Sequence, residues 1–231
     1  MTETNPLIIA LDVESGAEAL ALASSLGDAV SFYKVGMELY AAEGMSIVRE
    51  LLARGKQVFL DLKLYDIPET VKRATARIAS TGVRFLTVHG SDAVMRGAVE
   101  GRGASSLQLL AVTVLTSFDQ HDLAQLGYPC PVIDLVRLRA KNARACGIDG
   151  IVCSPLDAPQ VRAAAGPDAI LVTPGVRSHT AGKGDQKRVA TPAEAIAAGA
   201  NYLVIGRQVT RAAGPKAEVA RILEEIATAR T

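Results

Sequence analysis

The stretch VFLDLKLYDIPETVKRATARIAST, residues 58–81, places one strand and one helix in immediate succession. Residues 58–60 are apolar and suited to a strand, whereas the second half repeats its apolar residues at three- and four-residue spacing, as an amphipathic helix does. Between the two halves stand Asp61, Lys63 and Asp66. The pattern predicts a buried strand that ends in two carboxylates and an ammonium group.

The same unit, an apolar run followed by an alanine-rich helical segment, recurs along the whole chain. Near-continuous apolar strands that alternate with helices indicate a parallel sheet covered by helices. Several helical segments end at Gly, a common helix stop. The eight runs are residues 6–13, 30–36, 57–63, 84–90, 107–116, 149–155, 169–176 and 201–207. Eight such units predict a single α/β domain over residues 1–231, a closed (β/α)8 TIM barrel, with an open doubly wound sheet as the alternative.

The composition excludes several classes of protein. Hydrophobic residues make up 49% of the chain and charged residues 21%, as in a globular protein with a substantial core. A formal net charge of +1 provides no field that would attract nucleic acid or an anionic membrane. The N-terminus, MTETNPLIIALDV, has no signal-peptide pattern, and no stretch reaches the roughly 18 apolar residues of a membrane helix. We therefore expect no nucleic-acid or membrane partner.

The cysteines indicate the compartment. Cys130, Cys146 and Cys153 are odd in number and show no CxxC spacing. Disulfide frameworks and zinc sites usually have paired or closely spaced cysteines. We therefore expect buried free thiols in a reducing cytoplasm, and the 3 histidines are too few for a histidine-rich metal site.

Polar residues stand where the predicted strands end, which is the end of a (β/α)8 barrel that carries the active site. Asp61 and Lys63 are two residues apart and should point to the same face of their strand. If that face is the lumen, the first three strands form a cluster of Asp12, Lys34, Asp61 and Lys63. Structural ion pairs are the alternative interpretation. Desolvating each ion costs several kcal/mol, however, and apolar side chains would often be as stable. The cluster is better interpreted as a site.

The last two strand ends form a candidate phosphate site. Gly206 and Arg207 open the eighth helical region, and helix N-termini and glycine-rich turns present unpaired N–H groups to anions. Arg177, after the seventh strand, can supply a bidentate guanidinium group. Residues 177–190 are Gly-rich, charged and without a core pattern, which indicates a mobile loop. Together these features predict a phosphorylated ligand.

The lysines of the cluster are expected to carry a charge. Lys34 and Lys63 are flanked by carboxylates, and nearby negative charge favours the ammonium form. A Schiff-base lysine, as in aldolase barrels, is the alternative. A protonated lysine acts as a proton donor and charge stabiliser, and it is a poor nucleophile.

Taken in order, the motifs resemble those of the orotidine 5′-monophosphate decarboxylase family. DLKLYDIPETV resembles the DxKxxD signature of that family, which related sugar-phosphate decarboxylases and hexulose-phosphate synthases share. The other matching segments are ALDV, YKVG, AVTVLTS, TPGVR, DQKRVATPAEAI and VIGR. The metal-using relatives have an acidic residue where this chain has Lys34, so the resemblance implies no Mg²⁺ site and no cofactor. The family often has an aromatic residue or His in this part of the motif, and Tyr65 is a variation at a position that only flanks the charges.

The resemblance also implies a role for each motif residue. Lys34, Asp61, Lys63 and Asp66 would form the charged network, with Asp66 contributed across a homodimer interface. The other substrate contacts would be Asp12 and Lys34 to ribose hydroxyls, Thr70 to the ribose in the partner subunit, Thr116 and Ser117 to the pyrimidine, Gln186 to base and phosphate, and Arg177, Gly206 and Arg207 to the phosphate.

The implied reaction is the cofactor-independent conversion of orotidine 5′-monophosphate to UMP and CO2 in de novo pyrimidine biosynthesis. Lys63 would stabilise the carbanion left at C6 and then protonate it, and Asp61 would crowd the departing carboxylate. Two alternatives stay open from the sequence. One is a metal-dependent sugar-phosphate decarboxylase or aldolase on the same scaffold, and the other is a non-catalytic phosphonucleotide-binding protein.

Overall fold

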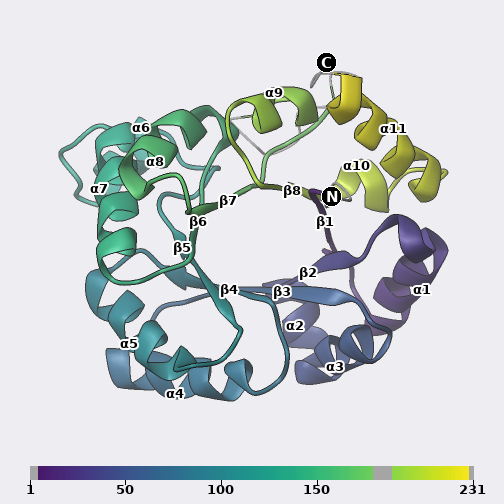
Figure 1. Ribbon diagram of the computed structural model, residues 1–231, viewed down its shortest axis with the longest axis horizontal. Coiled ribbons are helices and arrows are strands. Elements are labelled where there is room, and N and C mark those ends of the chain that lie inside the picture. The colour runs from purple at the N-terminus through teal and green to yellow at the C-terminus, as the bar shows by residue number, and fades with distance from the viewer. Residues whose placement is uncertain (1–4, 179–188, 229–231) are drawn as a thin grey trace.

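Eight parallel strands close into a barrel in chain order, from β1 to β8, in the computed structural model, which describes residues 5–178 and 189–228 (Figure 1). The closed barrel predicted from the sequence is confirmed, and the open sheet is wrong. The strands are β1 (Leu7–Ala10), β2 (Phe32–Gly36), β3 (Gln57–Leu64), β4 (Phe85–His89), β5 (Gln108–Val112), β6 (Gly150–Val152), β7 (Ile170–Thr173) and β8 (Tyr202–Ile205).

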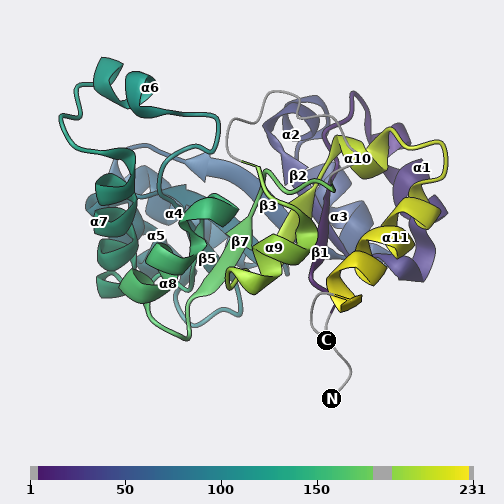
Figure 2. The same cartoon turned by 90° about the horizontal axis from the view of Figure 1, so that it is seen from above.

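Helices surround the ring of strands, and the short helices α6 and α10 lie at one end of the barrel (Figures 1 and 2). Local signals start and stop them: Ser15 caps α1, Thr191 and Glu194 form a capping box on α9, and Gly27 ends α1. The helices are α1 (Gly16–Leu26), α2 (Met37–Glu43), α3 (Met45–Ala53), α4 (Pro68–Ala79), α5 (Asp92–Arg102), α6 (Gln120–Gln125), α7 (Val132–Ala145), α8 (Ala158–Ala165), α9 (Pro192–Ala197), α10 (Arg207–Thr210) and α11 (Pro215–Thr228), with 3-10 turns η1 (Gly27–Ala29) and η2 (Pro155–Asp157).

Most strands are shorter than the apolar runs that predict them. The fifth run was expected to reach Thr116, but β5 ends at Val112 and the loop that follows contains Thr113 and Thr116. The run stays apolar because the loop is itself buried at the barrel end, where Val114 is only 5% exposed. An apolar pattern reports burial and does not by itself fix where the strand ends.

Alternate residues of each strand face the helices and the lumen, as the period of a strand requires. The lumen-facing apolar residues form a separate cluster of Ile8, Ala10, Phe32, Phe59, Phe85, Leu110, Val172 and Val204. Two residues further along three neighbouring strands the lumen becomes polar, at Lys34, Asp61 and Thr87. The aromatic layer therefore supports a polar layer at the carboxyl ends of the strands.

The opposite end of the lumen is filled by Arg84. Its guanidinium carbon lies 5.2 Å from the ring centroids of Phe32 and Phe85 and 5.4 Å from that of Tyr202. The same group donates hydrogen bonds to the hydroxyl of Tyr202, at 2.6 Å, and to the side chain of Gln57. Arg84 is half-buried, and both the aromatic faces and the two hydrogen bonds stabilise its cation there. We call this arrangement the floor of the barrel.

The three cysteines are free, as the sequence predicts. Full burial was expected for all of them, but only Cys153 is buried. Cys130 lies in the connection before α7 and Cys146 directly after it, so both are half-buried. No helix within residues 5–178 and 189–228 is long and apolar enough to cross a membrane.

Candidate active site

A cavity of about 530 Å³ opens at the carboxyl ends of the strands, within the range of roughly 300–1,000 Å³ that holds small organic ligands. We call this end the mouth of the barrel. Residues from distant parts of the chain converge on the cavity. Those predicted from the sequence that line it are Asp12, Lys34, Asp61, Lys63, Thr116, Ser117, Arg177, Gly206 and Arg207.

Four of these side chains form one row of alternating charge. The Nζ atom of Lys34 lies 2.9 Å from Asp12 Oδ1 and 3.7 Å from Asp61 Oδ2. The Nζ atom of Lys63 lies 2.9 Å from Asp61 Oδ1. The side chains of Lys34 and Asp61 are 10% and 14% exposed, whereas that of Lys63 is 32% exposed. The row predicted from the sequence is therefore present, and it leads from a buried pair to an ammonium group that a ligand can reach.

The pKa of Asp61 shows how burial and the neighbouring positive charges act together on this row. Burial acts to raise the pKa of its carboxyl group. The charges of Lys34 and Lys63, together with hydrogen bonds from Lys63 and Thr87, outweigh burial, so the pKa lies below its ordinary value. Asp61 is therefore held as a carboxylate between the two lysines.

Gly36 allows the first half of the row to pack closely. A Cβ atom at this position would lie 2.9 Å from Lys34 Nζ and 3.1 Å from Asp12 Oδ1. Gly36 also pairs with Asp61 in the ladder between β2 and β3. Any larger residue would push the ammonium group of Lys34 away from its two carboxylate partners.

Lys63 reaches the row from a distorted strand. Leu60 pairs with Leu86 and Leu64 with Val88, so the ladder between β3 and β4 shifts register across residues 61–63. Among the described residues, Lys63 is the one non-glycine residue with a positive φ, at 49°. We expected a regular strand to place Asp61 and Lys63 on one face. The two side chains do meet, but through a bulge, because three residues of β3 stand opposite the single residue between Leu86 and Val88.

Asp66 and Thr70 lie outside the row within a single chain. Asp66 is exposed, and its Oδ1 accepts a hydrogen bond of 2.6 Å from the amide of Ile67. Thr70 is half-buried in the first turn of α4 and is not part of the cavity lining. Both were assigned to the site of a partner subunit, and that assignment stays a prediction. Gln186 lies outside the described residues.

Arginines line the cavity after β7 and β8. Burial and the positive charge of Arg207 lower the pKa of Arg177 below its ordinary value, so the two guanidinium groups repel each other. Arg211 also lines the cavity and was missed by the sequence analysis. Its position four residues after Arg207, on the same helix face, was the available signal. This part of the cavity is suited to an anion.

Gln208 and Glu38 also line the cavity without having been predicted. The amide nitrogen of the Gln208 side chain donates to Ser178 Oγ at 3.0 Å and to Glu218 Oε1 at 2.7 Å. The backbone amide of Ser178 donates to Gln208 Oε1 at 3.1 Å. Gln208 therefore ties Ser178, the residue after Arg177, to the start of α10, and a lone glutamine in a short helix gives no sequence signal for such a role.

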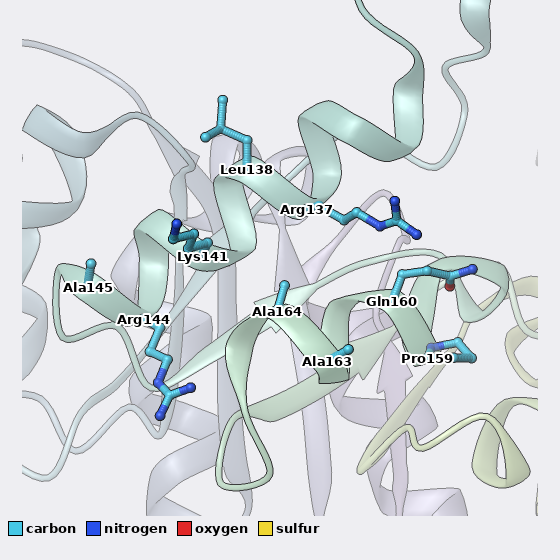
Figure 3. A pocket seen from close by; sticks show the side chains of 9 residues that line it. All are labelled: Arg137, Leu138, Lys141, Arg144, Ala145, Pro159, Gln160, Ala163 and Ala164. Carbon is cyan, nitrogen blue, oxygen red and sulfur yellow. The ribbon is translucent and has the colours of Figure 1, made fainter.

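A larger hollow, of about 1,120 Å³, lies between α7 and α8 on the outside of the barrel (Figure 3). Its polar side chains are Gln160 and three bases, and the remaining lining is aliphatic. The bases are Arg137, Lys141 and Arg144. Among the described residues, no carboxylate or histidine lines this groove, so they provide none of the acid–base pairs found at the mouth. The mouth is therefore the candidate active site.

Comparisons with known proteins agree with this geometry. A model of the "Orotidine 5′-phosphate decarboxylase / HUMPS family" matches residues 5–222. The chain is 53% identical over 225 residues to the orotidine 5′-phosphate decarboxylase of Rhodopseudomonas palustris (strain BisA53), covering 97% of this chain and 96% of the relative. It is 55% identical over 223 residues to that of Bradyrhizobium sp. (strain ORS 278), covering 96% and 92%. The crystal structure of orotidine 5′-phosphate decarboxylase from Lactobacillus acidophilus superposes with a TM-score of 0.85 at 35% identity, covering 96% and 99%.

Proposed function

The chain belongs to the orotidine 5′-phosphate decarboxylase / HUMPS family, and we propose that it converts orotidine 5′-monophosphate to UMP and CO2 in pyrimidine biosynthesis. We propose further that residues 1–231 form one catalytic domain. One observation carries the proposal: the alternating row of Asp12, Lys34, Asp61 and Lys63 borders a cavity that Arg177 and Arg207 also line. A row of fixed charges and two guanidinium groups around one cavity suit an anionic nucleotide.

Lys63 is the proposed acid. Loss of CO2 from C6 leaves a carbanion in the plane of the pyrimidine ring, with no adjacent carbonyl to delocalise it. A fixed ammonium group stabilises charge at the position where the charge develops, and does so most strongly where water is excluded. Lys63 is the more exposed lysine of the row, and Asp61 holds its Nζ at 2.9 Å. It can therefore face the reacting carbon and deliver a proton to it.

Asp61 and Lys34 have supporting roles in this mechanism. The carboxylate of Asp61 stays ionised, so it repels the substrate carboxylate that departs. Lys34 lies between two carboxylates and is only 10% exposed, which suits it to hold the row in place and to contact ribose. Asp12, at 50% exposure, is the second proposed ribose contact. Neither Asp61 nor Lys34 needs to exchange a proton with the substrate.

The phosphate is assigned to the part of the cavity that the arginines line. Arg177 and Arg207 repel each other, and a dianion between them would relieve that repulsion while accepting charge-assisted hydrogen bonds. Gly206 precedes Arg207 at the start of α10. Binding energy from a remote phosphate contributes to reaching the transition state as well as to affinity. Thr116 and Ser117 are the proposed contacts to the pyrimidine. Gln186 is a further proposed contact to the base and the phosphate.

A homodimer with shared sites completes the proposal. Asp66 is exposed beside the mouth, next to Tyr65 and Ile67, whose exposed fractions are 68% and 65%. Large apolar side chains with this exposure, adjacent to an unused carboxylate, are suited to burial against a second copy. Asp66 would then enter the site of the partner, and Thr70 would contact the ribose there.

Subunit mixing tests the shared site. Mixed Lys63→Ala and Asp66→Ala chains should recover about a quarter of wild-type turnover at equal ratio, because each hybrid dimer has one intact site. Lys63→Ala mixed with Asp61→Ala is the matched control. These two residues act in the same chain, so neither site of that hybrid is intact and activity should stay at background. Background activity in the first mixture, with subunit exchange demonstrated, would refute the shared site.

A metal-dependent sugar-phosphate decarboxylase or aldolase is the second candidate, because such enzymes share the DxKxxD signature. Within residues 5–178 and 189–228, no three His, Cys, Asp or Glu side chains are grouped so that they could hold a metal ion. Lys34 stands between Asp12 and Asp61, and its ammonium group occupies the space where a cation would bind those carboxylates.

The deciding experiment follows the loss of orotidine 5′-monophosphate absorbance by the purified protein in the presence of EDTA, with UMP and CO2 identified as products. The proposal predicts sustained turnover with one CO2 released per UMP formed. Turnover abolished by EDTA and restored by Mg²⁺ would favour the metal-dependent candidate. No turnover with or without metal, alongside UMP binding, would favour a phosphonucleotide-binding protein.

A further inference from the structure

Thr87 is a buried polar residue of β4 that no motif includes. Its side chain is 0% exposed and lies in the lumen, two residues after Phe85 of the aromatic layer. Its Oγ1 donates a hydrogen bond of 2.8 Å to Asp61 Oδ1 and accepts one of 2.9 Å from the backbone amide of Lys63. A single hydroxyl therefore touches both charged residues of the pair that borders the cavity.

The position of Thr87 explains why the bulge in β3 is stable. The regular ladder is interrupted between Leu60 and Leu64, and Thr87 is the residue of β4 that faces the interruption. The amide of Lys63 donates to the Thr87 side chain at this point instead of to a strand carbonyl. A left-handed backbone is strained for a residue with a Cβ atom, so the surrounding structure must hold it. Thr87 supplies a contact that does so.

Few side chains could take this place. A hydroxyl group is donor and acceptor at once, whereas a carboxylate only accepts and an ammonium group only donates. The β-branched side chain of Thr has few rotamers in a strand, so its hydroxyl is held in one direction. These properties suit Thr87 to fix a backbone amide and a carboxylate relative to each other.

On the premise of the proposed decarboxylation, we propose that Thr87 is a positioning residue for the reaction. It holds the backbone of Lys63 in the left-handed conformation and fixes Asp61 Oδ1, and thereby aims the ammonium group of Lys63 at the reacting carbon. Thr87 does not touch the substrate, since it is not part of the cavity lining. It acts only through Asp61 and Lys63.

Thr87→Val tests this role with little change in shape. The variant leaves the amide of Lys63 without its acceptor and removes one donor from Asp61, so the ammonium group loses its fixed position. A shift of about 1 Å in a reacting group can reduce the rate by about 100-fold. We expect kcat to fall by about 10- to 100-fold while KM changes by less than about 3-fold, because the proposed ribose and phosphate contacts are untouched. Thr87→Ser restores the hydroxyl and should recover most of kcat.

Thr173→Val is the matched control. Thr173 is also a strand residue with 0% exposure, and its hydroxyl donates to a backbone carbonyl, that of Tyr202, at 3.3 Å. This variant makes the same substitution at a buried hydroxyl that donates to a neutral carbonyl and does not touch the charged row. We expect its kcat to stay within about 2-fold of wild type, so any loss in stability common to the two Val variants can be subtracted.

Hydrogen exchange at the amide of Lys63 gives a readout that does not depend on activity. The amide is bonded to Thr87 Oγ1 in the wild type and should exchange at least about 10-fold faster in Thr87→Val than in wild type or Thr173→Val. Faster exchange together with the fall in kcat supports the proposal. Unchanged exchange, or a kcat within about 3-fold of wild type, overturns it. If the wild type itself fails to convert orotidine 5′-monophosphate, the proposed function fails, and exchange alone then decides whether Thr87 holds Lys63.

Discussion

The floor and the mouth of the barrel both enclose cations, but in opposite surroundings. At the floor, the guanidinium group of Arg84 is enclosed by three aromatic rings and bonded to neutral acceptors. At the mouth, Lys34 and Lys63 alternate with carboxylates beside a cavity of about 530 Å³. The same strands supply both ends, and a step of two residues leads from Phe32 to Lys34 and from Phe59 to Asp61.

The floor of the barrel contributes to stability, whereas the mouth is suited to chemistry. A cation packed against aromatic faces is stabilised by side chains of the fold itself, so Arg84 contributes to the stability of the folded protein. Ion pairs at the edge of a cavity are costly to desolvate and add little to stability. They do provide a fixed electric field that acts on a bound ligand. Substitutions at the two ends should therefore affect different measurements.

The largest expected effect is the loss of turnover in Lys63→Ala. Removing the proposed acid should reduce kcat by several orders of magnitude, while the fold and the binding of UMP are retained, because neither depends on this ammonium group. Steady-state kinetics, thermal unfolding and a UMP titration measure the three properties. A variant that keeps more than about a tenth of wild-type kcat, a loss of under about 1.4 kcal/mol, would contradict the assignment.

The next effect concerns Arg207, which lines the cavity at the start of α10. Arg207→Ala should cost several kcal/mol in kcat/KM, because truncation leaves part of the phosphate dianion unpaired. Phosphite dianion should partly rescue the turnover of a substrate that lacks its phosphate in the wild type, and much less so in Arg207→Ala. Arg137→Ala, in the groove between α7 and α8, is the control and should behave as wild type. Equal rescue in wild type and Arg207→Ala would remove Arg207 from the phosphate site.

A substitution at the floor should lower the stability of the protein and leave its turnover nearly unchanged. Arg84→Met keeps the stem of the side chain but loses the cation–π contacts and leaves the hydroxyl of Tyr202 without its donor. We expect a loss of about 2 kcal/mol in the free energy of unfolding, or a Tm lower by about 4–8 °C. The kcat of the folded protein should stay within about 2-fold of wild type. A Tm equal to that of wild type, or a large fall in kcat, would break the contrast between floor and mouth.

The smallest effect is a dependence of stability on pH. The pKa of Asp61 is lower in the folded state than its usual value of about 3.9, so its carboxylate stabilises the fold above that pH and this contribution is lost as pH falls through the folded-state pKa. The difference in the free energy of unfolding between wild type and Asp61→Asn should therefore be constant near neutral pH and shift against the wild type below about pH 4. Urea unfolding at several pH values measures it. A difference that moves in favour of the wild type in acid would contradict the direction of the pKa shift.

The sequence predicted the barrel because buried parallel strands read as continuous apolar runs, and eight runs were visible. It also located most of the polar side chains that line the cavity, since charges that end apolar strands are conspicuous. It could not show the bulge at Lys63, because register depends on two strands at once. Thr87 sits inside the apolar run RFLTVHG and carries no signal of its hydrogen bonds. The place of Asp66 could not be settled from one chain, because its expected neighbours lie in a second copy.

The central claim is that an ammonium group fixed at position 63 carries out the chemistry, and chemical rescue tests it most directly. Lys63→Cys, treated with 2-bromoethylamine, gains an S-aminoethylcysteine whose ammonium group has nearly the reach of lysine. The native Cys130, Cys146 and Cys153 are free, so treated wild type and treated Lys63→Ala serve as controls. We predict that treatment raises the kcat of Lys63→Cys by at least about 100-fold and leaves Lys63→Ala inactive. A treated Lys63→Cys protein that is folded, fully modified and able to bind UMP, yet no more active than before, would contradict the account.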